Sequence, residues 1–390
     1  MKSNLIKIFL LTLFTTSAAA QSPAFITPIE GTYLKDFFLV NYVDWSFNGI
    51  EDYNCGIKTY DGHQGTDFVI RNFSQMDSGV NVYAAVNGKV TFTIDTFFDR
   101  NKTAVSGGLG NYVSIVHEGK YYTYYGHLKL NSIIVQTGDS VVAGQKIGEV
   151  GSSGYTSDPH LHFEVWYDSL YNVDPFSGPC GNPTSLFQNQ LQYIDSFGII
   201  DHGLMGFIPT LDTLKERIPT QSIFSTNDDA ITFWMQGYGV QAGDVSKIKW
   251  YAADGSLWFS YNFTHPTEYW YFYWWSYIDV PATKPGLWKA EYYLNNELKI
   301  TQTFTVKKNK NIFNDGPVYF NFSESVFNLN LKTAADAETE VEIFDLMGRK
   351  IASGKIEAGN MFVKIQLPNI SKGIYFFKIA GLETTSFAVF

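Results

Sequence analysis

The chain has 390 residues, enough for about two to three domains at ~150 residues each, and its 45% hydrophobic and 17% charged residues exclude a disordered or fibrous protein. The formal net charge of -10, without any cluster of Lys and Arg, disfavours a nucleic-acid-binding surface. Aromatic residues make up 17% of the chain, and together with many Val, Ile and Thr residues they favour strands over helices. We therefore predict an all-β protein.

The first 20 residues have the pattern of a secretory signal peptide. Lys2 and Lys7 flank a short apolar run, and Ala18–Ala20 supply the small residues of a cleavage site before Gln21. The run is too short to span a membrane, and no other stretch approaches about 20 apolar residues. We expect residues 1–20 to be removed on export, with no transmembrane segment afterwards.

Residues 21–187 alternate short strand-like runs with turn residues such as Asn87-Gly88. This alternation predicts an antiparallel β domain. The polar, glycine-rich stretch at residues 95–110 interrupts the alternation, and we expect it to form a long loop at the rim of a groove.

The two cysteines, Cys55 and Cys180, lie toward the two ends of this predicted domain. They could remain free thiols, but an exported protein meets conditions in which they can pair. A bridge would close a loop of about 125 residues and stabilise the fold by ~4 to 5 kcal/mol if unstrained. We predict the bridge, because the pair brackets the residues that carry the chemistry.

Residues 190–308 contain seven of the nine tryptophans and predict an aromatic-rich β-sandwich. The aromatic run at residues 268–277 could bind sugars or peptides on its ring faces. The interpretation we favour is that these rings fill the interior. After a linker at residues 307–316, residues 316–390 alternate again and predict a small C-terminal β-sandwich module.

Two histidines open the predicted strand HLHFEVW. Positions two apart in a strand share a face, so His160 and His162 point the same way while Leu161 turns into the core. Paired imidazoles on one face suit a metal ion. The spacing does not decide which of the two histidines is the ligand.

A second pair of candidate ligands lies in GHQGTDF, where glycines allow a tight turn that brings His63 and Asp67 together. Two histidines and one aspartate form a three-ligand set with an open fourth position, as in catalytic rather than structural zinc sites. Zinc in such a site activates water and polarises a carbonyl, which is the chemistry of amide hydrolysis.

His127, at the end of the aromatic strand YYTYYGHL, is a candidate for proton transfer or for donation to a developing oxyanion. Each of these signals has a purely structural alternative, such as a hydrogen-bonded histidine pair at a sheet edge. Their combination in one domain favours a metal-dependent hydrolase.

The motifs GHQGTDF, VYAAVNGKV, GNYVSIVH, YYGHL and PHLHFEV occur in one order between His63 and about Pro175. In these motifs the chain resembles the lysostaphin-type zinc endopeptidases, also called peptidoglycan endopeptidases. The resemblance implies an antiparallel β-sheet zinc peptidase domain in which three side chains bind Zn²⁺ and two histidines are catalytic. The implied ligands are His63, Asp67 and His162, and the implied catalytic residues are His127 and His160.

Three further histidines, His117, His202 and His265, match no motif, and we interpret them as structural or surface residues. In the last 75 residues or so, VEIFDLMGRKI and LPNISKGIYFFKI resemble the C-terminal sorting domain of the type IX secretion system. This second resemblance implies that the type IX machinery is a partner and that the protein acts outside the cell or on its surface.

These observations lead to the hypothesis of a secreted zinc metalloendopeptidase acting on peptidoglycan cross-bridges or stem peptides of other bacteria. One alternative is an extracellular protease that degrades glycine-rich proteins. The other is a surface adhesin or glycan-binding protein with a vestigial zinc domain, supported by the tryptophan cluster.

Overall fold

The structure is a computed structural model that describes residues 22–225, 228–281, 284–307, 319–323, 325–331, 334–335, 337–367, 370–379 and 385–389. The predicted signal peptide, residues 1–20, and nearly all of the predicted linker, residues 307–316, lie outside these described residues. Strands are the main secondary structure of the described chain, and its α-helices are the short α1 (Phe73–Ser78) and α2 (Leu211–Glu216). The all-β prediction is confirmed.

The chain divides into two compact units. The first comprises residues 1–222, 230–278 and 289–303, and the second comprises residues 223–229, 279–288 and 304–390. Most of the middle region therefore belongs to the same unit as the N-terminal β domain. The three-domain division at residues 187, 190, 308 and 316 stays a prediction.

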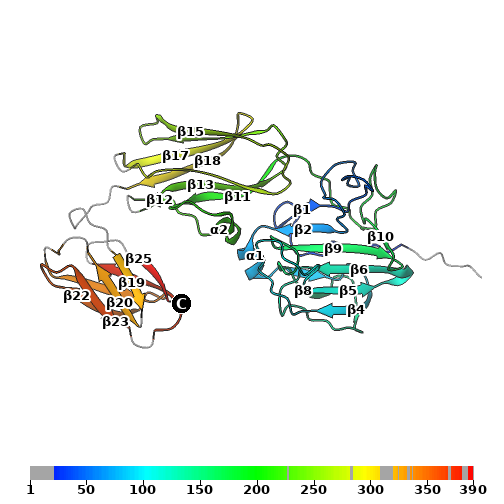
Figure 1. Cartoon of the computed structure of the whole chain (residues 1–390), viewed down its shortest axis with the longest axis horizontal. Helices are drawn as coiled ribbons and strands as arrows, with labels where there is room; N and C mark the ends of the chain where they lie inside the picture. Colours follow the sequence, from blue (N-terminus) through cyan, green and yellow to red (C-terminus); the bar gives the residue numbers. More distant parts are fainter. Residues whose placement is uncertain are drawn as a thin grey trace, which may run out of the picture. The chain divides into compact units, whose positions relative to one another are not determined.

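An eight-stranded antiparallel sheet dominates the N-terminal region, with the order β1-β2-β9-β6-β5-β4-β7 and with β10 beside β9 (Figure 1). A two-stranded sheet of β3 and β8 accompanies it, and a short 3-10 helix lies between β5 and β6. The elements are β1 (Phe37–Asn41), β2 (Thr66–Ile70), β3 (Asn81–Tyr83), β4 (Gly88–Ile94), β5 (Tyr112–Val116), the 3-10 helix (Glu118–Lys120), β6 (Tyr121–Gly126), β7 (Ser140–Val141), β8 (Lys146–Glu149), β9 (His160–Tyr167) and β10 (Tyr171–Asn172). The predicted loop at residues 95–110 lies between β4 and β5 and contains no helix or strand.

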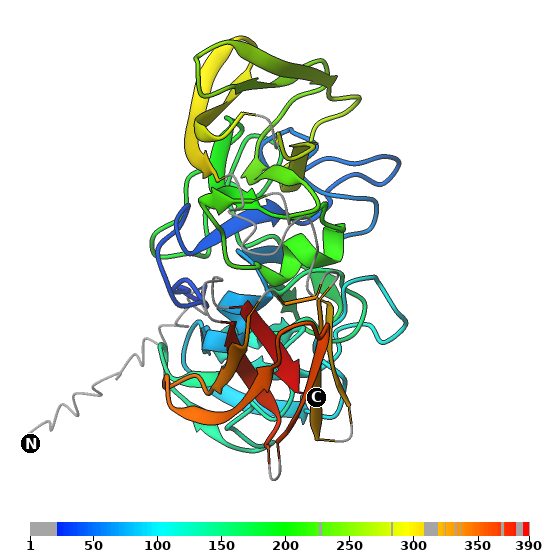
Figure 2. The same cartoon turned by 90° about the vertical axis from the view of Figure 1, so that its left-hand side faces the viewer.

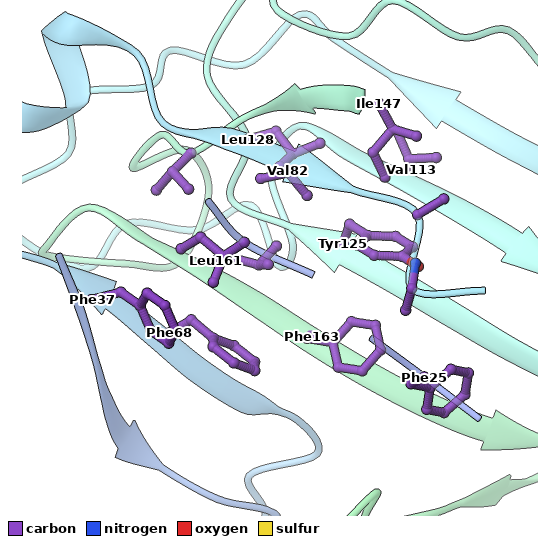
Figure 3. Packing of buried hydrophobic residues seen from close by; sticks show 14 of the residues in the cluster. Phe25, Phe37, Phe68, Val82, Val113, Tyr125, Leu128, Ile147, Leu161 and Phe163 are labelled. Atoms are coloured by element: carbon purple, nitrogen blue, oxygen red, sulfur yellow. The ribbon is translucent and has the colours of Figure 1, made fainter. Parts of the chain in front are cut away.

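The core of this region lies on one face of the sheet. Along β9, Leu161, Phe163 and Val165 are fully buried, as expected for alternate positions of a strand that covers a core. They pack with rings that include Phe68 from β2 and Tyr125 from β6 (Figure 3). The alternate residues of β9, which are His160, His162 and Glu164, therefore point to the opposite face.

The register of β9 with its neighbours assembles the candidate ligands. β2 pairs antiparallel with β9 so that Asp67 is opposite His162 and Val69 is opposite His160. On the other side of β9, Gly126 of β6 is opposite His162. Residues directly opposite each other in an antiparallel pair share a face, so the carboxylate and both imidazoles lie together on the face away from the core.

The disulfide between Cys55 and Cys180 is present, as predicted. It joins the turn after Tyr53 to the loop after Phe176, and the N–H of Cys180 also donates to the Tyr53 carbonyl at 3.0 Å. The rings of Tyr53 and Phe176 stack beside it. The bridge thus connects two segments that flank the sheet near both ends of the N-terminal region.

Two sheets form the middle region, a three-stranded sheet with the order β11-β13-β16 and a five-stranded sheet with the order β12-β18-β17-β14-β15. Figure 2 shows their green to yellow strands from a second direction. The strands are β11 (Gly198–Met205), β12 (Ile223–Phe224), β13 (Ile231–Tyr238), β14 (Val245–Tyr251), β15 (Leu257–Thr264), β16 (Phe272–Ile278), β17 (Gly286–Leu294) and β18 (Glu297–Val306).

The aromatic side chains of the middle region mainly fill its interior. Trp234, Trp250 and Trp288 are almost completely buried, and Trp274 in the aromatic run 268–277 is only 7% exposed. The favoured interpretation of the tryptophan cluster as core is confirmed for these side chains. The edge strand β15 differs, because all eight of its residues are exposed.

The C-terminal module contains a three-stranded sheet, β19-β20-β23, and a four-stranded sheet, β22-β21-β24-β25, around a hydrophobic core of its own. The strands are β19 (Tyr319–Ser323), β20 (Val326–Asn330), β21 (Thr339–Phe344), β22 (Lys350–Ile356), β23 (Phe362–Gln366), β24 (Gly373–Ile379) and β25 (Thr385–Val389). In the described part of the chain, no helix is long and apolar enough to cross a bilayer.

Candidate metal centre

Three donor atoms converge on the polar face of the eight-stranded sheet. Nδ1 of His162 lies 2.8 Å from Oδ1 of Asp67, and Nε2 of His63 lies 3.2 Å from the same oxygen and 3.3 Å from Nδ1 of His162. His63 and Asp67 come from the turn before β2 and from β2 itself, and His162 comes from β9. The three atoms form a small triangle of two imidazole nitrogens and one carboxylate oxygen.

This triangle fits a zinc ion. Ligands at 2.0–2.1 Å from a tetrahedral zinc are about 3.3 Å from one another, close to two of the three observed separations, while the third, between His162 and Asp67, is shorter at 2.8 Å. Two imidazoles and one carboxylate are donors that zinc accepts, and three of them leave a fourth position for water or substrate. All three side chains are buried, which protects such a site from competing solvent.

Each donor is oriented by a hydrogen bond on its far side. Nδ1 of His63 donates to the Tyr42 carbonyl at 2.7 Å, which leaves Nε2 free to bind an ion. Nε2 of His162 donates to Oε1 of Glu164 at 3.0 Å, which leaves Nδ1 free. Oδ2 of Asp67 accepts from the Asn41 amide at 2.7 Å, so Oδ1 faces the triangle. Partners of this kind fix the tautomer and direction of metal ligands.

His127 and His160 lie beside the triangle, with their ring centres 4.7 Å apart. Nδ1 of His127 donates to the Ser153 carbonyl at 2.7 Å, and Nδ1 of His160 donates to the Asp158 carbonyl at 2.8 Å. Nε2 of His160 lies 3.4 Å from Oδ1 of Asp67. In both rings Nε2 is therefore the nitrogen available to a substrate or a proton.

The structure brings together all five residues singled out from the sequence. It also groups His127, His160 and His162 as a second possible set of metal ligands, so proximity alone does not choose between the two sets. The donor set with His63 and Asp67 contains a carboxylate and is completely buried, whereas His160 is partly exposed. We therefore keep His63, Asp67 and His162 as the proposed ligands.

The charges of the cluster shift several pKa values. Burial raises the pKa of the Asp67 carboxyl, but the adjacent His63 and His160 outweigh burial and hold this pKa well below its usual value. Burial lowers the pKa of His162, but hydrogen bonds to Asp67 and Glu164 raise it to about 10. Without a cation, His162 therefore carries a proton that a metal ion would displace.

His127 has the opposite shift. Burial, together with the neighbouring His160 and His162, holds the pKa of His127 well below its usual value. The ring is therefore neutral at physiological pH, and its Nε2 carries a lone pair. Its backbone φ of 60° is in the left-handed region, which directs the chain sharply out of β6.

A row of aromatic rings extends from the cluster across the same face of the sheet. Tyr124 is opposite Glu164, and the Tyr124 and Tyr112 ring centres are 6.4 Å apart. Phe92 continues the row at 5.3 Å from Tyr112. Beside the cluster, the Tyr60 ring centre is 4.5 Å from that of His63. Aromatic rings therefore lie beside the candidate centre and extend from it across the same face of the sheet.

Comparisons with known proteins agree with this arrangement. Residues 61–175 match the model of peptidase family M23, and these residues contain all five candidate residues, four histidines and one aspartate. Lipoprotein NlpD of Yersinia enterocolitica is 35% identical over 89 residues, which are 23% of this chain and 79% of that protein. The chain belongs to peptidase family M23. The family resemblance inferred from the motifs is confirmed.

In other M23 relatives, the residues that match this chain are a smaller share of the relative's own length. Peptidoglycan DD-endopeptidase ShyA of Vibrio cholerae is 39% identical over 103 residues, 26% of this chain and 20% of that protein. Glycyl-glycine endopeptidase ALE-1 of Staphylococcus capitis is 33% identical over 162 residues, 39% of this chain and 40% of that protein. The chain thus spans less than half the length of either enzyme.

The C-terminal module also has a family match. Residues 317–388 match the secretion system C-terminal sorting domain, which confirms the second resemblance. A sorting domain of this kind indicates an exported protein.

Sequence reasoning did not identify Glu164 and Asn41, which orient ligands of the M23 site. Glu164 is two residues beyond His162 in β9, and the same period of two that pairs the histidines places this carboxylate on their face. The Glu164 carboxylate also accepts from the Trp166 indole at 2.6 Å, and Trp166 is the next residue of the same alternation along β9. Asn41 lies opposite Asp67 on β1, and no local pattern marks it.

Two of the three remaining histidines have hydrogen-bonded structural environments. His117 bonds to the Asn87 carbonyl at 2.9 Å and the Thr123 hydroxyl at 2.8 Å, and His265 bonds to the Ser246 hydroxyl at 2.8 Å. Among the residues that the structure describes, His117, His202 and His265 belong to no group of possible metal ligands. This agrees with their interpretation as structural residues.

Proposed function

We propose that this M23 chain is an exported zinc metalloendopeptidase that hydrolyses peptide bonds in the cross-bridges or stem peptides of peptidoglycan from other bacteria. The observation that carries the proposal is the triangle of His63, Asp67 and His162, flanked by two more imidazoles whose Nε2 atoms are unengaged by the backbone. A vestigial domain has no need of such a complete set of donors and orienting hydrogen bonds.

The residues divide the chemistry among them. A zinc ion held by the three ligands supplies Lewis-acid polarisation of the scissile carbonyl and a water nucleophile near neutral pH. Nδ1 of His127 donates to the Ser153 carbonyl, so its Nε2 carries the lone pair that can accept a proton from the nucleophile. His160 presents Nε2 to the same space, where, once this nitrogen has taken up a proton, it can donate to the developing negative charge or to the leaving amine. The backbone carbonyls at Nδ1 keep both rings in the required tautomer.

Peptidoglycan as substrate is supported by the relatives and by the surface of the chain. ShyA is a peptidoglycan DD-endopeptidase, and ALE-1 is a glycyl-glycine endopeptidase. The net charge of -10 gives little electrostatic attraction to an anionic polymer, so recognition must rely on shape and on apolar contacts. The rings of Tyr124, Tyr112 and Phe92 beside the cluster supply such contacts.

Export is supported by the sorting domain, and an oxidising destination is supported by the Cys55–Cys180 disulfide. We propose that the protein leaves through the type IX secretion machinery and acts as a secreted or surface protein. Action beyond the outer membrane favours foreign cell walls over the wall of the producing cell.

The test is a direct comparison of substrates. The purified full chain is incubated with Gram-positive cell walls, with defined muropeptides and with a glycine-rich protein, and products are identified by mass spectrometry. Release of muropeptide fragments that disappears on chelation or in His162→Ala supports the proposal. Cleavage of the protein substrate alone favours the extracellular protease, and full activity of metal-free protein overturns the zinc mechanism.

The adhesin alternative has one specific observation in its favour. Strand β15 exposes Phe259, Tyr261 and Phe263 at the edge of its sheet, whereas the tryptophans in the core are inaccessible. If the protein binds glycans through these rings, Tyr261→Ala reduces binding to insoluble polysaccharide without changing peptide cleavage. Absence of polysaccharide binding by the intact chain excludes this alternative.

A further inference from the structure

A buried lysine of the middle region reaches the loop that precedes strand β9. Helix α2 begins after Thr210, whose side chain caps it, and contains Lys215 in its last turn. Figure 1 shows α2 beside α1 of the N-terminal region, and the two helices are in contact. Lys215 is only 5% exposed, although lysine is seldom buried unless its ammonium group is paired.

All three N–H donors of Lys215 have acceptors in two loops beside the metal centre. Nζ donates to the Ser157 carbonyl at 2.8 Å, to Oδ2 of Asp158 at 2.9 Å and to the Lys102 carbonyl at 3.2 Å. Ser157 and Asp158 immediately precede β9, and Lys102 belongs to the long loop at residues 95–110. One side chain therefore fastens α2 to both loops.

The loop held by Lys215 in turn holds the ring of His160. The Asp158 carbonyl accepts from Nδ1 of His160 at 2.8 Å and from the Thr156 hydroxyl at 2.9 Å. Nε2 of the same ring faces Asp67 at 3.4 Å. Since the Asp158 carbonyl sets the direction of the ring, displacement of this loop would turn Nε2 away from the reacting atoms.

The next residue, Glu216, fastens the second loop. Its carboxylate pairs with Lys102 at 2.7 Å and with Nε of Arg100 at 3.2 Å, and Arg100 also pairs with Asp77 of α1 at 2.7 Å. The same loop reaches the turn behind His127, because the Asn101 amide donates to the Gly154 carbonyl at 3.0 Å. The end of α2 thus contacts the support of His160 directly, and it contacts the segment next to the support of His127 through the loop at residues 95–110.

A space-filling role does not account for a lysine at this position. Burial of an ammonium group costs several kcal/mol unless directed hydrogen bonds offset the cost, and a methionine fills similar volume without that cost. The compensating bonds of Lys215 all lead to atoms of these two loops rather than to its own helix. Their function is therefore to hold those loops in place.

We propose that Lys215 is a positioning residue for peptide hydrolysis, which orients His160 through Ser157 and Asp158 and makes the middle region part of the catalytic unit. This inference rests on the proposed function, since it assigns a role within that reaction. It goes beyond the M23 domain at residues 61–175, because Lys215 lies 40 residues after its end.

The test compares Lys215→Met with the wild-type full chain and with Lys120→Met as a matched control. Lys120 is exposed, and its ammonium group pairs with Asp168 at the surface. We expect Lys215→Met to lower kcat about tenfold to a hundredfold, as for a reacting group displaced by about 1 Å, with KM changed less than about threefold. Zinc content stays at the wild-type level, and the control retains its kcat.

A second measurement does not depend on activity. In full-length protein with ¹⁵N-labelled histidine, the hydrogen-bonded Nδ1–H of His160 is expected to lose its protection from solvent exchange in Lys215→Met. The corresponding protons of His63 and His127, which donate to other carbonyls, remain protected and serve as internal controls. If Lys215→Met does not fold, Lys215→Gln and Asp158→Asn, which weaken the same contacts, replace it.

The outcomes separate this inference from the proposed function. Wild-type protein that cleaves none of the substrates refutes the proposed function, and the exchange measurement then decides the role of Lys215. A folded variant with wild-type kcat and a protected His160 proton overturns the inference. A drop in kcat that appears only under conditions in which the variant begins to unfold also overturns the inference, because such a drop shows a purely structural role for Lys215.

Discussion

The orientation of His162 by Glu164 leads to a quantitative prediction about metal affinity. Nε2 of His162 donates to Oε1 of Glu164 at 3.0 Å, and the Trp166 indole donates to Oε2 at 2.6 Å. The carboxylate therefore accepts from two N–H groups at once. In Glu164→Gln, one carboxylate oxygen becomes an NH₂ group, so one of these two donors faces another donor.

We expect Glu164→Gln to weaken zinc binding about tenfold to a hundredfold, the usual effect of removing a partner that orients a metal-ligating histidine. This corresponds to about 1.4 to 2.7 kcal/mol of binding free energy. Glu164 is only 8% exposed, so solvent cannot replace the lost charge effectively. The ligands themselves remain, and the variant should still bind one zinc ion at saturation.

Competition with a chromophoric chelator at fixed pH measures the zinc dissociation constants of wild type and variant. Glu149→Gln is the control, because it makes the same chemical change at a carboxylate that pairs with Lys146 and Lys129 rather than with a proposed ligand. Equal zinc affinity of wild type and Glu164→Gln, in folded protein, would refute the reasoning that Glu164 orients His162.

Three further predictions concern activity and stability. His127→Ala is expected to retain zinc and lose turnover by about a hundredfold or more, measured by metal analysis and peptide cleavage, and loss of zinc would contradict its assigned role. Burial raises the pKa of Asp174 to about 7, so its stabilising contribution is complete below about pH 4 and is lost as pH rises through 7. Urea unfolding should therefore show that wild type loses up to ~4 kcal/mol relative to Asp174→Asn between pH 4 and pH 8, whereas parallel pH profiles would contradict this. Replacing Cys55 and Cys180 by serine should lower the unfolding free energy by ~4 to 5 kcal/mol, and an unchanged denaturation midpoint would show that the bridge contributes little.

The sequence predicted those parts of the site that follow from local periodicity. The period of two along β9 placed His160 and His162 on one face and Leu161 in the core, and this requires no knowledge of neighbouring strands. The same reasoning left the choice of ligand open, because it does not determine which ring nitrogen faces inward. That depends on the partners of Nδ1 and Nε2, here the Asp158 carbonyl and the Glu164 carboxylate.

The features that the sequence did not predict depend on contacts between distant segments. Asn41 reaches Asp67 because β1 lies beside β2, and Lys215 reaches Asp158 because α2 packs near the N-terminal region. Neither contact is marked by a motif or a periodicity in the residues next to Asn41 or Lys215. The all-β class and the interior role of most tryptophans were predictable, because composition and alternation depend on burial alone.

The pairing of Asp67 with His162 across β2 and β9 has a consequence for the maturation of the protein. Two of the three proposed ligands lie opposite each other on neighbouring strands of one antiparallel ladder, so the pairing of the strands rather than the cation holds their backbones in place. Small zinc-dependent folds behave differently, since their chains remain unfolded until the ion arrives. Here the polypeptide can complete its folding first and load its ion last, and the apoprotein should remain a folded acceptor for zinc.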